Sequence, residues 1–222
     1  MTRITSTNVE DPHGPQPVLA AGTTLETAKA VLVMIHGRGA SAESILALHS
    51  ELGADGVAAL APQAAGSTWY PYSFLVPTDA NQPHLDSALN KIDAVVNDLL
   101  SRGFAGGRIA ILGFSQGACL ASEYIARHPR RYGAVMALTG GLIGPDRAPR
   151  NYAGSLEGTP VFLGTSDPDP HVPFPRVQET AEVLTRLGAK VDLRRYPGMP
   201  HTINEEEIRA CRMLVEAVVN GE

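Results

Sequence analysis

Several kinds of residue and segment are scarce or absent in this chain, and each shortage excludes a class of protein. The two cysteines, Cys119 and Cys211, cannot form the disulfide framework on which small secreted domains depend. No apolar run approaches the roughly 20 residues that cross a bilayer, so we expect no stable membrane insertion. Residues 1–17 are polar and contain no apolar core of a secretory signal. Together these shortages predict a cytoplasmic protein.

Basic residues are also too few and too scattered for a nucleic-acid-binding surface. Lys and Arg number 18 against 23 Asp and Glu, which gives a formal net charge of -5 at pH 7. Phosphate backbones are bound through clustered positive charge, and the sequence has no run of Lys and Arg. We therefore expect no nucleic-acid partner.

The composition that remains is that of one globular domain. Hydrophobic residues make up 44% and charged residues 18% of the 222 residues, and this length is enough to bury a sizeable core. No internal repeat, low-complexity tract or linker divides the chain. We predict a single domain over residues 1–222, with residues 1–17 as a loose N-terminal arm. The sequence leaves a monomer and a homodimer both open.

Apolar patterning predicts an alternation of strands and helices. Continuous apolar runs are typical of strands that are buried on both faces, as in a parallel sheet. Strands are expected at 17–20, 30–36, 57–62, 108–113, 134–138, 159–164 and 191–196, and helices at 41–52, 85–102, 116–128, 175–187 and from 204 onward. The predicted fold class is α/β, with a mostly parallel central sheet that carries helices on both faces.

The most informative stretch is 108–121, where an apolar run ends in Gly113-x-Ser115-x-Gly117 and a helix-compatible run follows. Strand, sharp turn with a serine, and helix is the arrangement of a nucleophile elbow. A Cβ at either glycine would collide with neighbouring backbone, and the start of the helix offers free N–H groups that stabilise an oxyanion. An ordinary Gly-rich turn without chemistry is the alternative.

A Gly-rich loop, 36–40, follows the strand at 30–36. Ligands bind at the carboxyl ends of strands in α/β sheets, and glycines let the backbone approach them. The backbone amide of Arg38 is therefore our candidate for a second oxyanion donor, while its side chain is expected to be solvated. His36 is interpreted as a structural hydrogen-bonding residue rather than a base.

Two loops carry candidate pocket residues. Aromatic residues are only 5% of the chain, yet the stretch 67–75 contains several of them, among them Trp69 and Tyr70. These rings either wall an apolar substrate pocket or cover the core beneath a long loop. Leu142 and Ile143 likewise either line an acyl channel or serve as packing residues.

A catalytic Ser–His pair requires a carboxylate that orients the histidine. The stretch 165–173 offers Asp167, spaced as in Gly-x-x-Asp, and Asp169, spaced as in Asp-Pro-x-Val-Pro. We favour Asp169 because the prolines that follow it fix the backbone of the turn, but the choice stays open. His201 lies between the last predicted strand and the last predicted helix. The resulting chain order Ser…Asp…His is that of α/β-hydrolases.

Four motifs together resemble the phospholipase/carboxylesterase family of α/β-hydrolases, which includes the acyl-protein thioesterases: HGRG at 36–39, GFSQG at 113–117, DPHVP at 169–173 and GMPH at 198–201. The resemblance implies an α/β-hydrolase fold without a large lid domain. It also implies a catalytic triad and an oxyanion hole formed by two backbone N–H groups: Ser115, Asp169 and His201 for the triad, Arg38 and Gln116 for the hole. The acid loop is longer than in the acyl-protein thioesterases. The chain is therefore more similar to the bacterial small-molecule esterases of the family.

The expected function is that of a serine hydrolase that cleaves carboxylic esters of short to medium acyl chains through an acyl-enzyme intermediate. Its partner would be a small-molecule ester, and it would need no cofactor. Asp167, Asp169, His171 and His201 lack the paired spacing of metal motifs, so no metal is expected. The alternatives are a thioesterase or lysophospholipase, a lactone hydrolase, and a catalytically silent relative that only binds a small ligand.

Overall fold

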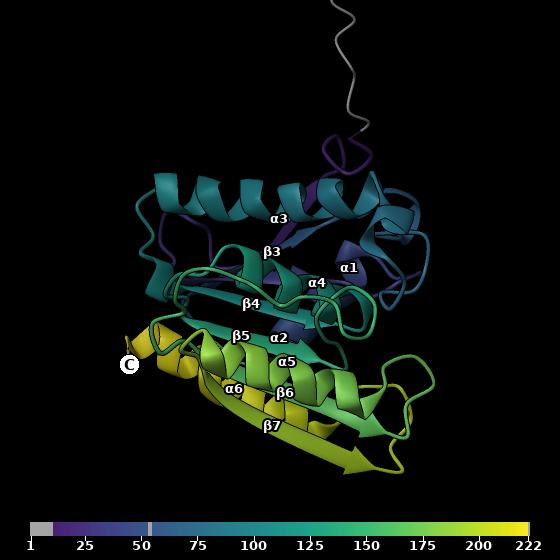
Figure 1. Cartoon of the computed structure of the whole chain (residues 1–222). Helices are drawn as coiled ribbons and strands as arrows, with labels where there is room; N and C mark the ends of the chain where they lie inside the picture. The colour runs from purple at the N-terminus through teal and green to yellow at the C-terminus, as the bar shows by residue number, and fades with distance from the viewer. Residues whose placement is uncertain (1–10, 53–54, 222) are drawn as a thin grey trace, which may run out of the picture.

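A seven-stranded sheet runs through the centre of the computed structural model, which describes residues 11–52 and 55–221 (Figure 1). The strands are β1 (Val18–Gly22), β2 (Ala30–Ile35), β3 (Val57–Pro62), β4 (Ile109–Phe114), β5 (Ala134–Leu138), β6 (Pro160–Asp167) and β7 (Lys190–Pro197). Their spatial order is β1-β3-β2-β4-β5-β6-β7. β1 pairs antiparallel with β3, and the other neighbours are parallel.

Helices cover both faces of this sheet, as the sequence predicts. One face packs against α3 (His84–Ser101), α4 (Gln116–Arg127) and α5 (Phe174–Arg186), and the other against α1 (Ala42–Leu46), α2 (Leu48–Leu52) and α6 (Glu205–Asn220) (Figure 1). Alternate residues of β2 enter the two cores, with Val31 and Val33 on the first face and Leu32 and Met34 on the second. This two-sided burial explains the continuous apolar runs. Among the described residues, no helix combines the length and hydropathy that crossing a bilayer requires.

The predicted strands and helices are confirmed with small shifts in their bounds, and one helix differs. The helix expected over 41–52 is two short helices that meet at Ala47, which keeps helical backbone angles of φ -57° and ψ -30°. Ser41 caps the first of them, since its hydroxyl accepts a hydrogen bond from Ser44 N. Gly53, which follows the predicted helix, lies outside the described residues.

The N-terminal arm is not loose where the structure describes it. The first ten residues lie outside the described part, but residues 11–17 dock through His13, whose side chain is fully buried. The imidazole Nε2 donates to Trp69 O at 2.9 Å, and Nδ1 accepts from Ala65 N at 3.0 Å. The backbone N–H of His13 donates to Ser87 Oγ at 2.9 Å. The expectation of a loose arm is thus corrected for 11–17, because a buried side chain anchors this segment.

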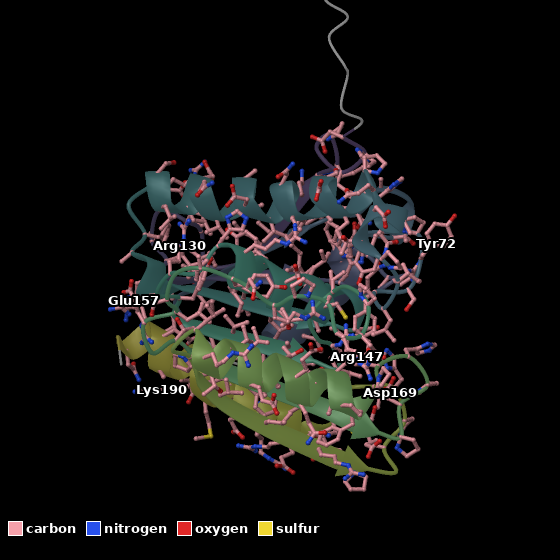
Figure 2. All side chains as sticks on the ribbon, in the orientation of Figure 1. Tyr72, Arg130, Arg147, Glu157, Asp169 and Lys190 are labelled. Atoms are coloured by element: carbon pink, nitrogen blue, oxygen red, sulfur yellow. The ribbon has the colours of Figure 1, made fainter. Side chains whose placement is uncertain are left out.

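The carboxyl ends of the parallel strands meet at one edge of the sheet. Figure 2 shows Tyr72 and Asp169 at this edge, to the right of the view, whereas Glu157 and Lys190 lie at the opposite end. The loops that follow β2, β3, β4, β6 and β7 all leave the sheet here. This edge therefore brings together the predicted site residues from distant parts of the chain.

Candidate active site

The turn after β4 holds Ser115 in a strained conformation. Its backbone angles are φ 55° and ψ -117°, a combination that non-glycine residues rarely adopt. A Cβ on Gly113 would run into the carbonyl of Gly117, and a Cβ on Gly117 would run into the carbonyl of Ile35. Both glycines are therefore required by close backbone contacts. The turn has the geometry of a nucleophile elbow, with the serine directly before α4.

His201 lies between a hydroxyl and a carboxylate. Its Nε2 is 2.9 Å from Ser115 Oγ, and its Nδ1 is 2.7 Å from Asp169 Oδ2. A proton on Nδ1 donates to the carboxylate, which leaves Nε2 free to accept the proton of the serine hydroxyl. The structure thus brings together three predicted side chains that come from the loops after β4, β6 and β7.

The surroundings of Asp169 keep its carboxylate ionised. Its side chain is shielded from solvent, and its Oδ2 also accepts from Ser166 Oγ at 2.6 Å. Its Oδ1 accepts from the backbone N–H groups of His171 and Val172, both at 2.8 Å. Burial by itself raises the pKa of Asp169, but hydrogen bonds from Ser166, His201 and the two amides outweigh burial and hold the pKa below its ordinary value.

Asp167, the other candidate acid, has a different partner. It is the last residue of β6, and its carboxylate forms an ion pair with the guanidinium of Arg195 on β7. The chain then turns back, so Asp169 faces the centre of the site while Asp167 faces the outer strand. Of the two acids that the sequence left open, Asp169 is the one that contacts His201.

Two backbone segments flank Ser115. Gln116 is the first residue of α4, so its N–H has no partner within the helix and lies at the positive end of the helix dipole. On the other side, a Cβ on Gly37 would lie 3.4 Å from Ser115 Cβ, which shows that the loop carrying Arg38 lies directly against the serine. The segments that carry both predicted oxyanion donors are therefore adjacent to the hydroxyl.

A cavity of about 640 Å³ opens beside these groups, a volume typical of small-molecule sites. Ser115, His201, Arg38 and Gln116 contribute to its lining. Most of the remaining wall is apolar or aromatic and comes from two loops and the end of β4: Tyr70, Pro71, Tyr72, Phe74, Leu75, Phe114, Pro170, Val172 and Pro173. Of the described residues that line the cavity, none is an aspartate or glutamate.

The predicted pocket residues are only partly found in this lining. Tyr70 lines the cavity, whereas Trp69 does not. Trp69 is fully buried, and its indole N–H donates to His36 O at 2.9 Å. Its ring lies between those of His13 and His36, with centroid distances of 5.3 and 5.0 Å. Trp69 thus supports the loop from below instead of facing a substrate.

Leu142 and Ile143, for which the sequence left an acyl channel and packing both open, lie outside the lining of this cavity. Both are buried, and the backbone of their loop is bound to helices. Leu142 N donates to Thr180 Oγ1 of α5 at 2.9 Å, and Ile143 N donates to Glu123 Oε2 of α4 at 3.1 Å. Because their loop is bound to α4 and α5, the two residues pack against these helices.

His36 has the structural role that the sequence indicates, and Cys119 is a buried free thiol. His36 Nδ1 donates to Gly37 O at 2.8 Å, and its Nε2 accepts from Ala64 N at 3.1 Å. Burial lowers the pKa of His36, which keeps the imidazole neutral. Cys119 reaches the cavity wall, but burial raises the pKa of its thiol to about 12, so it is not a nucleophile. Within the described chain, no group of three or more metal-ligating side chains is clustered.

The sequence did not predict the hydrogen bonds that the side chains of Arg38 and Gln116 form with the backbone of residues 69–72. The Gln116 amide accepts from Trp69 N and donates to Tyr70 O, both at 2.9 Å. Arg38 is exposed, but its guanidinium donates to three consecutive carbonyls, Tyr70 O, Pro71 O and Tyr72 O, at 2.8 to 2.9 Å. No signal in the sequence could have revealed these bonds, since backbone acceptors carry no side-chain identity.

Comparison with known proteins places this geometry in a family. The phospholipase/carboxylesterase profile matches residues 22–219. The chain belongs to this family. Among solved structures, a phospholipase/carboxylesterase from Dyadobacter fermentans is 44% identical, with a TM-score of 0.89 over 94% of this chain and 99% of that chain. The resemblance read in the sequence is thus confirmed, and so is the α/β-hydrolase fold.

Curated family members are more distant. Acyl-protein thioesterase 1 from Debaryomyces hansenii is 33% identical over 113 residues, 50% of this chain and 49% of its own length. A probable carboxylesterase from Arabidopsis thaliana, SOBER1-like, is 25% identical over 138 residues, 60% of this chain and 53% of its own length. The chain spans about half the length of the curated relatives it matches.

Proposed function

We propose that this family member is a serine hydrolase that cleaves carboxylic esters of short to medium acyl chains through an acyl-enzyme intermediate. The observation that carries the proposal is the hydrogen-bonded path from Ser115 Oγ through His201 to Asp169, beside a largely apolar cavity. A hydroxyl, an imidazole and a carboxylate in this order form the apparatus for acyl transfer to serine.

The proposed first half-reaction transfers the acyl group to the enzyme. Ser115 Oγ attacks the ester carbonyl carbon while His201 Nε2 takes the hydroxyl proton. The backbone N–H groups of Arg38 and Gln116 stabilise the oxyanion, and Asp169 stabilises the imidazolium. The ester C–O bond then breaks as His201 returns the proton to the leaving alcohol. In the second half-reaction, water attacks the acyl-enzyme with His201 again as base, and the carboxylic acid leaves.

The cavity supports the proposed substrate range. Its volume of about 640 Å³ accommodates a medium acyl chain, and its wall offers aromatic and aliphatic contacts without a facing carboxylate among the described residues. No cofactor or metal is needed for this chemistry, and the proposed partner is a small-molecule ester. Thioester cleavage is a second candidate, favoured by the similarity to acyl-protein thioesterase 1 of Debaryomyces hansenii.

A cytoplasmic location is part of the proposal. It is supported by Cys119 and Cys211, which are both buried free thiols, because free cysteines are typical of reducing compartments. Sedimentation or light scattering would distinguish the monomer from the homodimer that the sequence leaves open.

The test combines covalent labelling with a substrate panel. We expect wild-type protein to hydrolyse p-nitrophenyl butyrate and to be labelled by a fluorophosphonate, and Ser115→Ala to lose both while keeping its thermal unfolding midpoint. The loss of activity should be about 10⁴-fold or more. A panel of ester, thioester and lactone substrates then ranks the bond types. A Ser115→Ala variant that still turns over or takes the label would contradict the proposal, and a wild type that does neither would indicate a silent ligand-binding relative.

A further inference from the structure

Residues 69–72, of which Tyr70, Pro71 and Tyr72 line the cavity, are bound to the two residues that carry the proposed oxyanion donors. Gln116 holds this segment at Trp69 N and Tyr70 O, and Arg38 holds it at three consecutive carbonyls. Each of the two residues thus has two separate parts. Its backbone belongs to a segment adjacent to Ser115, and its side chain holds the surface against which an acyl group would rest.

The Gln116 connection is short and well shielded. The side chain is only 6% exposed, and its single planar amide accepts from Trp69 N, just before the wall, and donates to Tyr70 O in the wall. Its backbone is fixed at the start of α4, a helix whose residues are almost all buried. A planar amide with both ends bonded allows little rotation. The wall at Tyr70 therefore keeps a set distance from the backbone N–H of Gln116.

The Arg38 connection adds three bonds from one rigid group. Its Nη1 donates to Pro71 O, and its Nη2 donates to Tyr70 O and Tyr72 O. Charge-assisted bonds of this kind are stronger than neutral ones, and the planar guanidinium fixes their directions. An ammonium group has no such fork, so lysine at this position would not reproduce the arrangement.

The far side of the wall is anchored independently. Tyr72 N donates to Asn81 Oδ1 at 2.9 Å, and Asn81 Nδ2 donates to Ser73 O at 3.0 Å. Trp69 is held from below by its bond to His36 O. With these anchors the segment keeps its shape, and the Arg38 and Gln116 side chains decide where it sits relative to the reacting atoms.

We propose that the side chains of Gln116 and Arg38 are positioning residues that fix the acyl-binding wall relative to the oxyanion N–H groups, and that they thereby set the preference for acyl length. The inference rests on the proposed esterase function. An acyl chain long enough to contact Tyr70 has its carbonyl placed by the wall, so a displaced wall misaligns the carbonyl with the N–H groups. An acetyl group is too short to be steered in this way. Misplacement by about 1 Å can cost about 100-fold in rate.

The experiment compares p-nitrophenyl acetate with p-nitrophenyl octanoate in wild-type protein, Gln116→Ala and Arg38→Lys. The backbone N–H groups remain in both variants, so hydrolysis of the acetate should fall less than hydrolysis of the octanoate. We expect the octanoate-to-acetate ratio of kcat/KM to fall at least about tenfold, mostly through kcat, because the apolar cavity still binds the chain. Arg38→Lys alters an exposed residue, so this variant should fold even if Gln116→Ala folds poorly.

Gln63→Ala is the matched control. Gln63 makes the same kind of two-point contact, since its Oε1 accepts from Ala42 N at 2.8 Å and its Nε2 donates to Ala64 O at 2.9 Å. It does not belong to the cavity lining. The control should lower the unfolding midpoint by an amount similar to Gln116→Ala while leaving the octanoate-to-acetate ratio as in the wild type.

The outcomes separate the inference from the function on which it rests. An active wild type whose ratio is unchanged in both variants, or whose two esters lose rate equally, contradicts the positioning role and leaves the esterase function standing. A control that shifts the ratio as far as Gln116→Ala also contradicts it, because a general loss of stability would then explain the effect. A wild type inactive on both esters contradicts the esterase function together with the inference.

Discussion

The carboxylate of Asp169 lies 2.7 Å from Nδ1 of His201, while Asp167, two residues earlier, pairs with Arg195 at the surface. A single turn of backbone after β6 therefore separates an acid that orients the histidine from one that braces an outer strand. Asp167 therefore serves as a control for substitutions of Asp169.

Replacing the two acids one at a time tests this contrast. Asp169→Asn removes the charge that stabilises the imidazolium and favours the wrong histidine tautomer, so we expect kcat for p-nitrophenyl butyrate to fall by about 10³- to 10⁴-fold. Asp167→Asn should stay within about threefold of the wild type, since it loses only a partly exposed ion pair. Steady-state kinetics at pH 8 measure both. The opposite ranking would assign the orienting role to Asp167.

Glu207 gives the free energy of unfolding a specific pH dependence. It is fully buried at the start of α6, where its Oε2 accepts from Asn204 N at 2.9 Å and completes the capping box that ends the His201 loop. Burial raises the pKa of Glu207 from 4.5 to about 7. A carboxyl with a raised native pKa contributes stability that is fully present below pH 4.5 and is lost as the pH rises through about 7.

Glu207→Gln should remove this dependence, because the amide oxygen can still accept from Asn204 N without carrying a charge. We expect the variant to gain about 1 to 3 kcal/mol over the wild type in urea unfolding on going from pH 5 to pH 8. Glu205→Gln, at a side chain 95% exposed in the same helical turn, is the control and should show no such gain. Parallel pH curves for the wild type and Glu207→Gln would show that Glu207 does not titrate in this range.

The buried histidines on either side of Trp69 make the site sensitive to acid. His13 and His36 each accept a backbone N–H bond, from Ala65 and Ala64, which only the neutral imidazole can do. Burial lowers the pKa of both histidines in the folded protein below the ordinary histidine value of 6.5. Below pH 6.5 these two histidines therefore bind more protons in the unfolded chain than in the folded protein. The free energy of unfolding falls as the pH drops below that value.

Urea unfolding at pH 7, 6 and 5 measures this loss. We expect His13→Gln to be less stable than the wild type at pH 7, through the loss of buried hydrogen bonds, by about 1 to 3 kcal/mol. The gap should narrow toward pH 5, since glutamine does not titrate. A gap that stays constant across the three pH values would contradict a neutral His13 in the folded protein.

Both cysteines should be chemically silent in the folded protein. Burial raises the pKa of the Cys119 and Cys211 thiols to about 12, so almost no thiolate is present at pH 8. Ellman's reagent should react rapidly with neither thiol in the native state and with both after denaturation, and iodoacetamide should leave esterase activity unchanged. Rapid inactivation of native protein by iodoacetamide would indicate that Cys119 is reactive in the cavity wall.

Much of the architecture follows from local rules that act along the chain. Continuous apolar runs place the parallel strands, because a strand buried on both faces needs apolar residues at every position. The two glycines around Ser115 predict the elbow, since only glycine fits where backbones touch. The chain order of serine, acid and histidine then predicts which loops meet at the carboxyl edge of the sheet.

Only the tertiary structure decided the contacts whose partners lie far away in the chain or are backbone groups. Trp69 and Tyr70 are neighbours with similar rings, yet one supports the loop and the other faces the cavity. His13 docks under a loop more than 50 residues away, and Gln116 binds backbone groups that any residue could present. Periodicity and spacing report which face of an element is apolar. They cannot report which distant backbone group completes a hydrogen bond, because that depends on how the whole chain packs.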